Sequence, residues 1–280
     1  MALSIHTNYS ALTTNTALNK SNSSLATNQQ RLGTGLRINS AADDAAGLQI
    51  ATRLNAQSRG MGVAMRNVGD ATSMLQTAEG SFSEVTDILQ RMKDLSTQAA
   101  NDTNGVSDRT SLKSEYDELG KELVNIVNNT KYAGEALFAA GGKFSAAVNF
   151  QIGASAAEKL TMDVTADMTA LRTELTATVQ AGTMDTAANA GTTITALETA
   201  LNNVGSMRAK LGANINRLSH TSNNLANMKD NTDMAKGRIM DADFAIESAN
   251  MSKNSMLMQS GISMLKQAGQ MPGMVMGLLG

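Results

Sequence analysis

Between residues 50 and 99 the apolar side chains follow one another in alternating steps of four and three residues. This spacing keeps one apolar seam on one side of an α-helix. At a rise of 1.5 Å per residue the helix would be roughly 75 Å long, and it would need packing partners because isolated helices have little stability of their own. The seam positions, of which only Gln57 and Ser96 are polar, are Ile50, Leu54, Gln57, Met61, Ala64, Val68, Ala71, Leu75, Ala78, Phe82, Val85, Leu89, Met92, Ser96 and Ala99.

Two later segments offer such partners. A short seam follows the loop-forming residues 101–105, and a short loop makes consecutive helices antiparallel neighbours. A long seam with the same spacing resumes at Ile194 and continues to Leu225, interrupted by Arg208 and Ser222. We expect the two long helices to pack on each other through Leu75, Phe82, Val85, Leu89, Leu197, Leu201, Leu211 and Leu218.

The two ends of the chain carry much narrower apolar stripes, with residues seven apart. A helix with so narrow a stripe cannot hold itself without a partner seam. We therefore expect the terminal helices to depend on intermolecular contacts. The candidate self-assembly positions are Leu18, Leu25, Leu32, Phe244, Met251, Met258, Ile262 and Leu265. Gly33 and Gly35 interrupt the first stripe, and Ser40 with Asp43 reads as the N-cap of the long helix.

The period changes after residue 142. Apolar residues alternate from Phe144 to Ile152 and again from Leu160 to Val164, with a turn at Gly153, which predicts a β-hairpin. Residues 165–191 are rich in Thr and Ala, and we interpret them as a loop with one short helix. The pattern as a whole predicts a mainly α protein. It would be a long antiparallel coiled-coil or helical-bundle rod with a small β-hairpin unit and both termini at one end.

Composition supports this class. The chain has no Trp, no Cys and one Pro, with 3% aromatic residues, which suits long helices packed through aliphatic side chains better than a sandwich or barrel. Charged residues make up 17% and the net charge is −2, so there is no basic footprint for nucleic acid. A polar but weakly charged surface favours a subunit that packs against copies of itself.

No constellation for catalysis or metal binding can be assembled from the sequence. Thiol chemistry and disulfides are excluded without cysteine, and His6 and His220 lie far apart without a ligand motif. The acid pairs at Asp43–Asp44 and Asp241–Asp243 are better explained as helix caps. We expect no enzyme activity, no cofactor and no metal. With neither a secretory signal nor an apolar run long enough to insert into a membrane, these features alone favour a cytoplasmic protein.

Residues 31–50, Arg-Leu-Gly-Thr-Gly-Leu-Arg-Ile-Asn-Ser-Ala-Ala-Asp-Asp-Ala-Ala-Gly-Leu-Gln-Ile, closely resemble the signature of bacterial flagellin. The resemblance extends through residues 90–98, 150–153, 211–217 and 240–252, and covers roughly the first 165 and the last 90 residues. It implies a terminal coiled-coil domain from 1–42 and 240–280, which lines the inner channel of the filament. It also implies a rod domain from 43–165 and 191–239. Residues 166–190 would be a short connector in place of the outer domains of longer flagellins.

The resemblance further implies a structural subunit of the helical flagellar filament, which is extracellular and serves motility. Family members are exported unfolded by the flagellar type III apparatus, and this replaces the cytoplasmic reading. The implied partners are further copies of the chain in a homopolymer, the filament cap, hook-associated proteins and a flagellin export chaperone. The family also implies a contact surface for a vertebrate Toll-like flagellin receptor, whose matching positions here are Gln90, Arg91, Leu95, Gln98 and Glu115.

Three other functions fit the sequence less well. A hook–filament junction protein shares the terminal motifs, but it would depart more in the rod signature. An intracellular signalling hairpin of the chemoreceptor type also has long seams, but it would have more Glu and Lys and no β unit. An enzyme is the weakest alternative.

Overall fold

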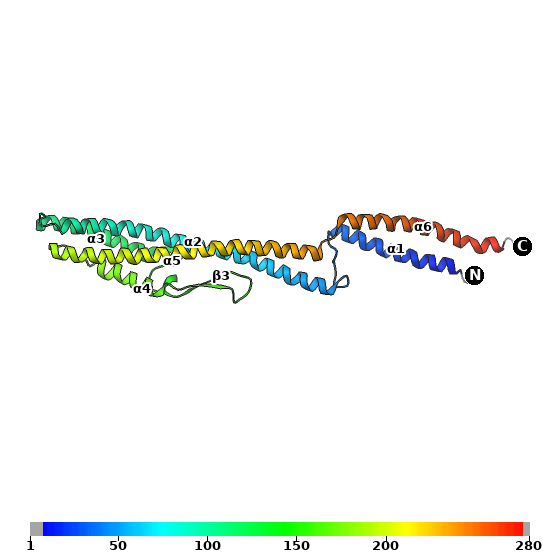
Figure 1. Cartoon of the computed structure of the whole chain (residues 1–280), viewed down its shortest axis with the longest axis horizontal. Helices are drawn as coiled ribbons and strands as arrows, with labels where there is room; N and C mark the ends of the chain where they lie inside the picture. The colour runs from blue at the N-terminus through cyan, green and yellow to red at the C-terminus, as the bar shows by residue number, and fades with distance from the viewer. Residues whose placement is uncertain (1–7, 277–280) are drawn as a thin grey trace. The chain divides into compact units, whose positions relative to one another are not determined.

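The computed structural model describes residues 8–276, apart from the side chains of residue 178 and residues 271–276 (Figure 1). The chain divides into two compact units, which we call the terminal unit (residues 1–58 and 230–280) and the central unit (residues 59–229). In chain order the elements are α1 (Tyr9–Thr34), α2 (Ala45–Ala99), α3 (Val106–Asn129), β1 (Lys131–Tyr132), β2 (Glu135–Ala136), the 3₁₀-helix η1 (Lys143–Ser145), β3 (Val148–Gln151), β4 (Lys159–Met162), α4 (Thr165–Thr173), the π-helix η2 (Glu174–Val179), α5 (Ala187–Met240) and α6 (Phe244–Met276). The predicted mainly α fold with a small β-hairpin is confirmed.

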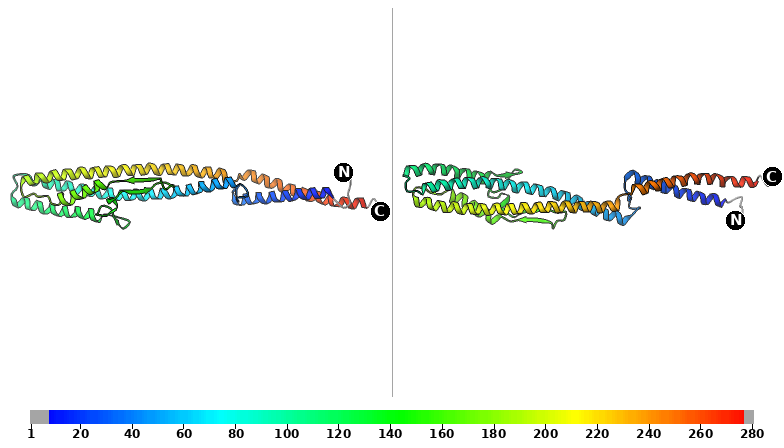
Figure 2. Two further views of the ribbon diagram at one scale, coloured as in Figure 1. Left: turned by 90° about the horizontal axis from the view of Figure 1, so that it is seen from below. Right: turned by 45° about the horizontal axis from the view of Figure 1, so that its top comes forward.

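The core of the central unit forms along the predicted seam of α2. All seam positions from Met61 to Ala99 are buried, including Ser96, whose hydroxyl donates a hydrogen bond to the carbonyl of Met92 at 2.9 Å. On α5, every predicted core position is buried except Leu201, which is half-buried against the same core. Figure 2 shows α2, α3 and α5 running alongside one another in the central unit. The 3,4 spacing thus identified the residues that hold this unit together.

Helix α3 supplies the third wall of this core through Tyr116, Leu123 and Val127, all of which are buried. Asp108 stabilises its first turn, because Oδ2 accepts a hydrogen bond from the backbone N–H of Gly105 at 3.0 Å. The loop between α2 and α3 falls where the sequence predicted it.

The predicted β-hairpin is present, with Val148 paired to Met162 and Phe150 paired to Leu160 in an antiparallel register. Its first strand begins later than the alternation suggested, because Phe144 lies in η1 and packs with Phe138 at a ring-centroid distance of 5.9 Å. A second small antiparallel pair, β1–β2, was not predicted. Its turn contains Gly134 at φ 86°, a conformation that glycine adopts at little cost.

The segment 165–191 is not mainly a loop, and this expectation was wrong. Helix α4 continues directly into η2, and α5 begins at Ala187. The helical face was hidden among threonines, which have low helix propensity, and burial of the apolar positions overrides that preference. Those positions are Met168, Leu171, Leu175 and Val179, spaced by three and four residues and each at most 2% exposed.

In the terminal unit α1 and α6 pack side by side and antiparallel (Figures 1 and 2). The start of α1 reaches the far part of α6, where Asn8 Nδ2 donates to the carbonyl of Ala268 at 2.6 Å. The end of α1 reaches the start of α6, where Arg31 and Glu247 form an ion pair at 3.0 Å. Gly35 ends α1 in the left-handed conformation at φ 72°, where the sequence predicted an interruption by glycine.

The start of α2 differs from the expectation. The helix begins at Ala45, and its first turn is capped by Asp44, whose Oδ1 accepts from the N–H of Gly47 at 2.8 Å. Ser40 is therefore not the N-cap. Asp43 instead closes the preceding turn, since its Oδ2 accepts from the backbone N–H groups of Asn39 and Ser40.

The compact units also divide the chain at other positions than the predicted domains. The predicted boundaries lie at residues 42 and 240, whereas the terminal unit extends to residue 58 and begins again at residue 230. The apolar core of the central unit starts only at Met61 and ends at Leu225. The first turns of α2 and the last turns of α5 lie outside that core, which accounts for the shift.

Candidate assembly surfaces

Exposed large apolar side chains are concentrated in the terminal unit. Of the thirteen among the described residues, ten belong to it: Tyr9, Leu12, Ile50, Met234, Phe244, Ile246, Met256, Leu257, Ile262 and Met264. The central unit, which is the larger of the two, exposes Val63, Val106 and Met228. Clusters of exposed apolar side chains mark surfaces that are covered by a partner. Among the described residues, the terminal unit therefore carries most of the exposed large apolar side chains.

The phenylalanines show the same contrast in one residue type. Four of the five are at most 9% exposed in the central unit, where Phe82 and Phe138 lie 4.6 Å apart between ring centroids. The fifth, Phe244 at the start of α6, is 67% exposed. Exposure of the largest apolar side chain of α6 is costly for a protein that stays monomeric.

The predicted terminal stripe divides into two sets. One set is half-buried on α1 and α6 and consists of Leu18, Leu25, Leu32, Met251, Met258 and Leu265. The other set, Phe244 and Ile262, is exposed at 67% and 46%.

Polar side chains occupy the deepest positions of the α1–α6 interface. Asn28 is the one buried residue of α1, and Glu247 is 7% exposed on α6. Arg31 Nη1 pairs with Glu247 Oε1 at 3.0 Å. Within the described part of the chain, Asn28 Nδ2, Arg31 Nε and Glu247 Oε2 have no hydrogen-bond partner. Apolar periodicity could not have identified these residues. Polar residues at contact positions of a narrow apolar stripe nevertheless indicate a polar contact at that place.

The positions that match the receptor surface lie on α2 and α3 in the central unit. Gln90, Arg91, Gln98 and Glu115 are exposed, and Arg91 donates to Glu115 Oε1 from Nη2 at 2.6 Å and from Nε at 2.9 Å. Leu95 differs from the others, because it is 2% exposed and belongs to the core. The folded central unit exposes four of the five side chains and buries Leu95.

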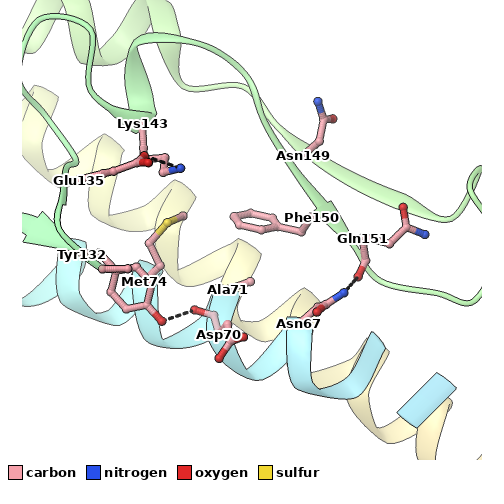
Figure 3. Close-up of a pocket in the computed structure, with 11 residues that line it drawn as sticks. Asn67, Asp70, Ala71, Met74, Tyr132, Glu135, Lys143, Asn149, Phe150 and Gln151 are labelled. Carbon is pink, nitrogen blue, oxygen red and sulfur yellow. Dashed lines mark hydrogen bonds and ion pairs between the residues drawn. The ribbon is translucent and has the colours of Figure 1, made fainter. Parts of the chain in front are cut away.

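A hollow of about 340 Å³ lies between α2 and the small β elements (Figure 3). Tyr132 OH donates to the carbonyl of Asp70 at 3.1 Å, and Asn67 Nδ2 donates to the carbonyl of Gln151 at 3.2 Å. Phe150 points into the space between them. These bonds fasten the β elements to α2, and the lining residues include no His and no Cys. The hollow shows how the β unit is held, and the Lys143 and Glu135 side chains at its edge form an ion pair at 2.6 Å.

Titratable groups in the described residues form no cluster that could bind a metal. No group of three His, Asp or Glu side chains there could hold a metal ion, and His220 is exposed, while His6 lies outside the described residues. The pKa of the Tyr116 phenol is raised because burial disfavours its ionised form. No helix among the described residues is both long enough and apolar enough to cross a membrane.

Comparison with known proteins agrees with this arrangement. The sequence model described as the bacterial flagellin N-terminal helical region matches residues 5–143. The model described as the bacterial flagellin C-terminal helical region matches residues 194–279. Together they cover more than half of the chain. The chain belongs to the bacterial flagellin family.

Full-length relatives support the same assignment. This flagellin is 36% identical to Flagellin A of Vibrio anguillarum and 33% identical to Polar flagellin C of Vibrio parahaemolyticus, and each match covers 100% of both chains. The first alignment spans 383 positions, about 100 more than the 280 residues of this chain. The chain is therefore a short flagellin without a large variable region. Residues 144–193, between the two matched family regions, are where it departs from both models.

A solved structure of a flagellar hook-associated protein from Vibrio parahaemolyticus has a similar fold. It has a TM-score of 0.57 at 16% identity, and the match covers 71% of this chain and 100% of that one. Identity this low indicates a shared fold only. The protein is a structural subunit of the extracellular bacterial flagellar filament rather than an enzyme. As a member of this family it polymerises into the filament.

Proposed function

We propose that the terminal unit of this flagellin carries the principal contacts between subunits in the filament. The observation that supports this is the concentration of exposed apolar side chains on α1 and α6, with Phe244 as the largest. Burial of one such side chain against a neighbour contributes about 1.5–3 kcal/mol before the cost of association is counted. The half-buried stripe of Leu18, Leu25, Leu32, Met251, Met258 and Leu265 would hold the two helices together, while Phe244 and Ile262 would contact another copy.

Narrow stripes also explain why assembly and ordering would be coupled. A two-helix unit with half-buried apolar contacts gains much of its stability only when neighbours cover its outer faces. Interfaces of such obligate polymers bury on the order of 2,000 Å² or more. Contacts that do not close into a ring produce a helical filament, and alternative packings of the same seams would allow it to change supercoil.

A matched pair of substitutions tests this role. Ile262 on α6 and Val63 in the central unit are both helical and both 46% exposed. We expect Ile262→Asn to raise the critical concentration for seeded filament growth about tenfold, which corresponds to about 1.4 kcal/mol of lost contact energy. Val63→Asn should leave it within about twofold of the unchanged protein, since surface substitutions away from contacts have small effects. Equal effects of the two substitutions, or none from Ile262→Asn, would refute the proposal.

We also propose that this chain leaves the cell unfolded through the flagellar type III apparatus, and that an export chaperone covers its terminal apolar residues before assembly. The sequence without cysteine supports this, because no disulfide would have to be broken for the chain to unfold. The exposed Met256 and Leu257 on α6 are suitable chaperone contacts, and the filament cap would receive the chain at the growing end. Loss of secretion in a strain without the apparatus is the expected result, and unchanged secretion would contradict it.

We also propose that the central unit contacts the vertebrate Toll-like flagellin receptor. Gln90, Arg91, Gln98 and Glu115 are exposed, and Arg91 pairs with Glu115, whereas Leu95 would act by holding the helix in place. In a receptor reporter assay, Arg91→Ala should reduce the response to monomer without lowering the melting temperature, whereas Leu95→Ala should lower both. No response to the unchanged monomer at saturation would remove the proposal.

A further inference from the structure

The apolar stripes of α1 and α6 leave the register between the two helices undetermined. On α1 the stripe is Leu18, Leu25 and Leu32, and on α6 it is Met251, Met258 and Leu265, with steps of seven residues in both. Because both stripes repeat every seven residues, an antiparallel slip of seven places apolar side chains opposite apolar side chains again. Periodic apolar contacts specify a register weakly when every step repeats. Backbone hydrogen bonds from the N–H of Arg37 to the carbonyl of Met240 at 2.6 Å and from the N–H of Ala242 to the carbonyl of Gly35 at 2.9 Å join the end of α1 to the start of α6. Along the two helices, contacts other than the apolar stripes must hold the register that the structure shows.

The polar residues of the interface do not repeat in this way. Arg31 and Glu247 form an ion pair at 3.0 Å, with the Glu247 side chain 9% exposed, and Asn28 is buried one turn earlier on α1. Asn254 lies seven residues after Glu247 in the sequence, and Met240 lies seven residues before Glu247. A slip in one direction would leave the buried carboxylate of Glu247 facing Ser24 instead of a guanidinium, and a slip in the other direction would carry it past Thr34, the last residue of α1. A buried charge without its partner is strongly unfavourable.

We propose that Arg31 and Glu247, with Asn28 beside them, fix the register of α1 on α6 and so select the form of the terminal unit that can be added to a filament. A single polar pair in a narrow helix interface lowers stability but excludes the alternatives that apolar contacts tolerate. The three residues are positioning residues. They set where Phe244 and Ile262 lie relative to α1, and the inference rests on the proposed role of the terminal unit.

The absence of cysteine from the natural sequence permits a direct measurement of register. A Cβ on Gly261 would lie 3.0 Å from Leu18 Cγ, so Leu18→Cys with Gly261→Cys reports the observed register. Leu18→Cys with Asn254→Cys or with Ala268→Cys reports a slip of seven residues in either direction. In the observed register those pairs are displaced by about 10.5 Å along the helix, which is beyond the reach of a disulfide.

Each pair is placed in the full chain, polymerised on filament seeds and oxidised, and cross-links within one chain are identified by mass spectrometry after dissociation. With Arg31 and Glu247 unchanged, we expect the pair with Gly261→Cys to cross-link at least tenfold more than either slipped pair. In the double variant Arg31→Leu with Glu247→Leu, which keeps the positions apolar, the slipped pairs should increase at least tenfold. Slipped pairs that stay at background in the leucine variant would overturn the inference.

A charge exchange provides the matched control. Arg31→Glu with Glu247→Arg retains an ion pair and should restore the cross-link pattern of the natural chain. Slipped products equal to those of the leucine variant would show that the ion pair does not set the register.

If the leucine variant does not polymerise, the single variant Arg31→Glu and the exchange are compared in seeded growth. The single variant should elongate at least tenfold more slowly than the exchange, and equal rates with an intact central unit would overturn the inference. Failure of the proposed function is a different result, because it appears as normal growth of Ile262→Asn protein.

Discussion

The hydroxyl of Tyr116 offers the sharpest test of how the segment 165–191 is held. Tyr116 is fully buried on α3, and its OH donates to the carbonyl of Val179, the last residue of η2, at 2.6 Å. Tyr116→Phe removes this donor from a buried carbonyl that keeps one other hydrogen bond, from the backbone N–H of Gly182 at 3.2 Å. The expected loss is about 0.5–1.5 kcal/mol of unfolding free energy, the usual net contribution of one hydrogen bond.

For a unit of this size, each kcal/mol lowers the melting temperature by about 2–4 °C, so Tyr116→Phe should lower it by roughly 1–6 °C. Tyr132→Phe is the control, because its OH also donates to a backbone carbonyl, that of Asp70, but at an exposed site. We expect less than about 0.5 kcal/mol there, since water replaces the lost donor. Calorimetry or circular dichroism on the monomer measures both. Equal shifts for the two variants would refute the argument that burial determines the cost.

The same residue has a spectroscopic signature. Burial raises the pKa of the Tyr116 phenol, so it should remain neutral at a pH where a free tyrosine, with a pKa of about 10, is ionised. Because the folded pKa is raised, the stability linked to this group is complete below the unfolded pKa and falls as the pH rises above it. The difference in phenolate absorbance between natural protein and Tyr116→Phe should appear only as the chain unfolds in alkali.

Two further predictions concern the core and the turn before α2. Leu75→Ala should lower the free energy of unfolding by about 2–5 kcal/mol because Leu75 is 0% exposed, whereas Ile50→Ala, at 41% exposure, should lower it by under about 1 kcal/mol. Denaturant titration measures both losses, and similar values would contradict the core assignment. Hydrogen bonds from Ser40 and Asn39 hold the Asp43 pKa below its ordinary value of 3.8, so its stabilising effect should be present above that pH and be lost as the pH falls through the lowered pKa. The stability difference between the natural chain and Asp43→Asn should therefore disappear in acid, and a difference that persists there would refute the linkage.

Helix periodicity predicted the long helices of this fold, which are buried on one face along much of their length. The seam from Met61 to Ala99 could be identified because each step repeats and nearly every residue is apolar. The prediction failed where tertiary contacts override local signals. Leu171 and Leu175 are buried between threonines that suggested a loop, and Phe144 leaves its strand pattern to pack against Phe138.

The candidate sites show the same limit. The stripe residues were predicted from their spacing of seven, but spacing alone could not separate Phe244, which is exposed, from Met251, which is half-buried. The distinction depends on which face of α6 meets α1. Nor could spacing identify Arg31 and Glu247 as a pair, because they are 216 residues apart in the sequence. A family motif indicated Leu95 as a contact position, whereas the structure buries its side chain in the core.

The most direct test of the assembly account compares the full chain with a chain spanning residues 43–240, which retains α2 and α5 but lacks α1 and α6. Both are mixed at neutral pH with short filament fragments, and elongation is followed by light scattering and electron microscopy. The account predicts long filaments from the full chain. The shortened chain should not elongate the fragments, although it should still show a cooperative melting transition. Filaments from the shortened chain would show that the terminal helices do not carry assembly.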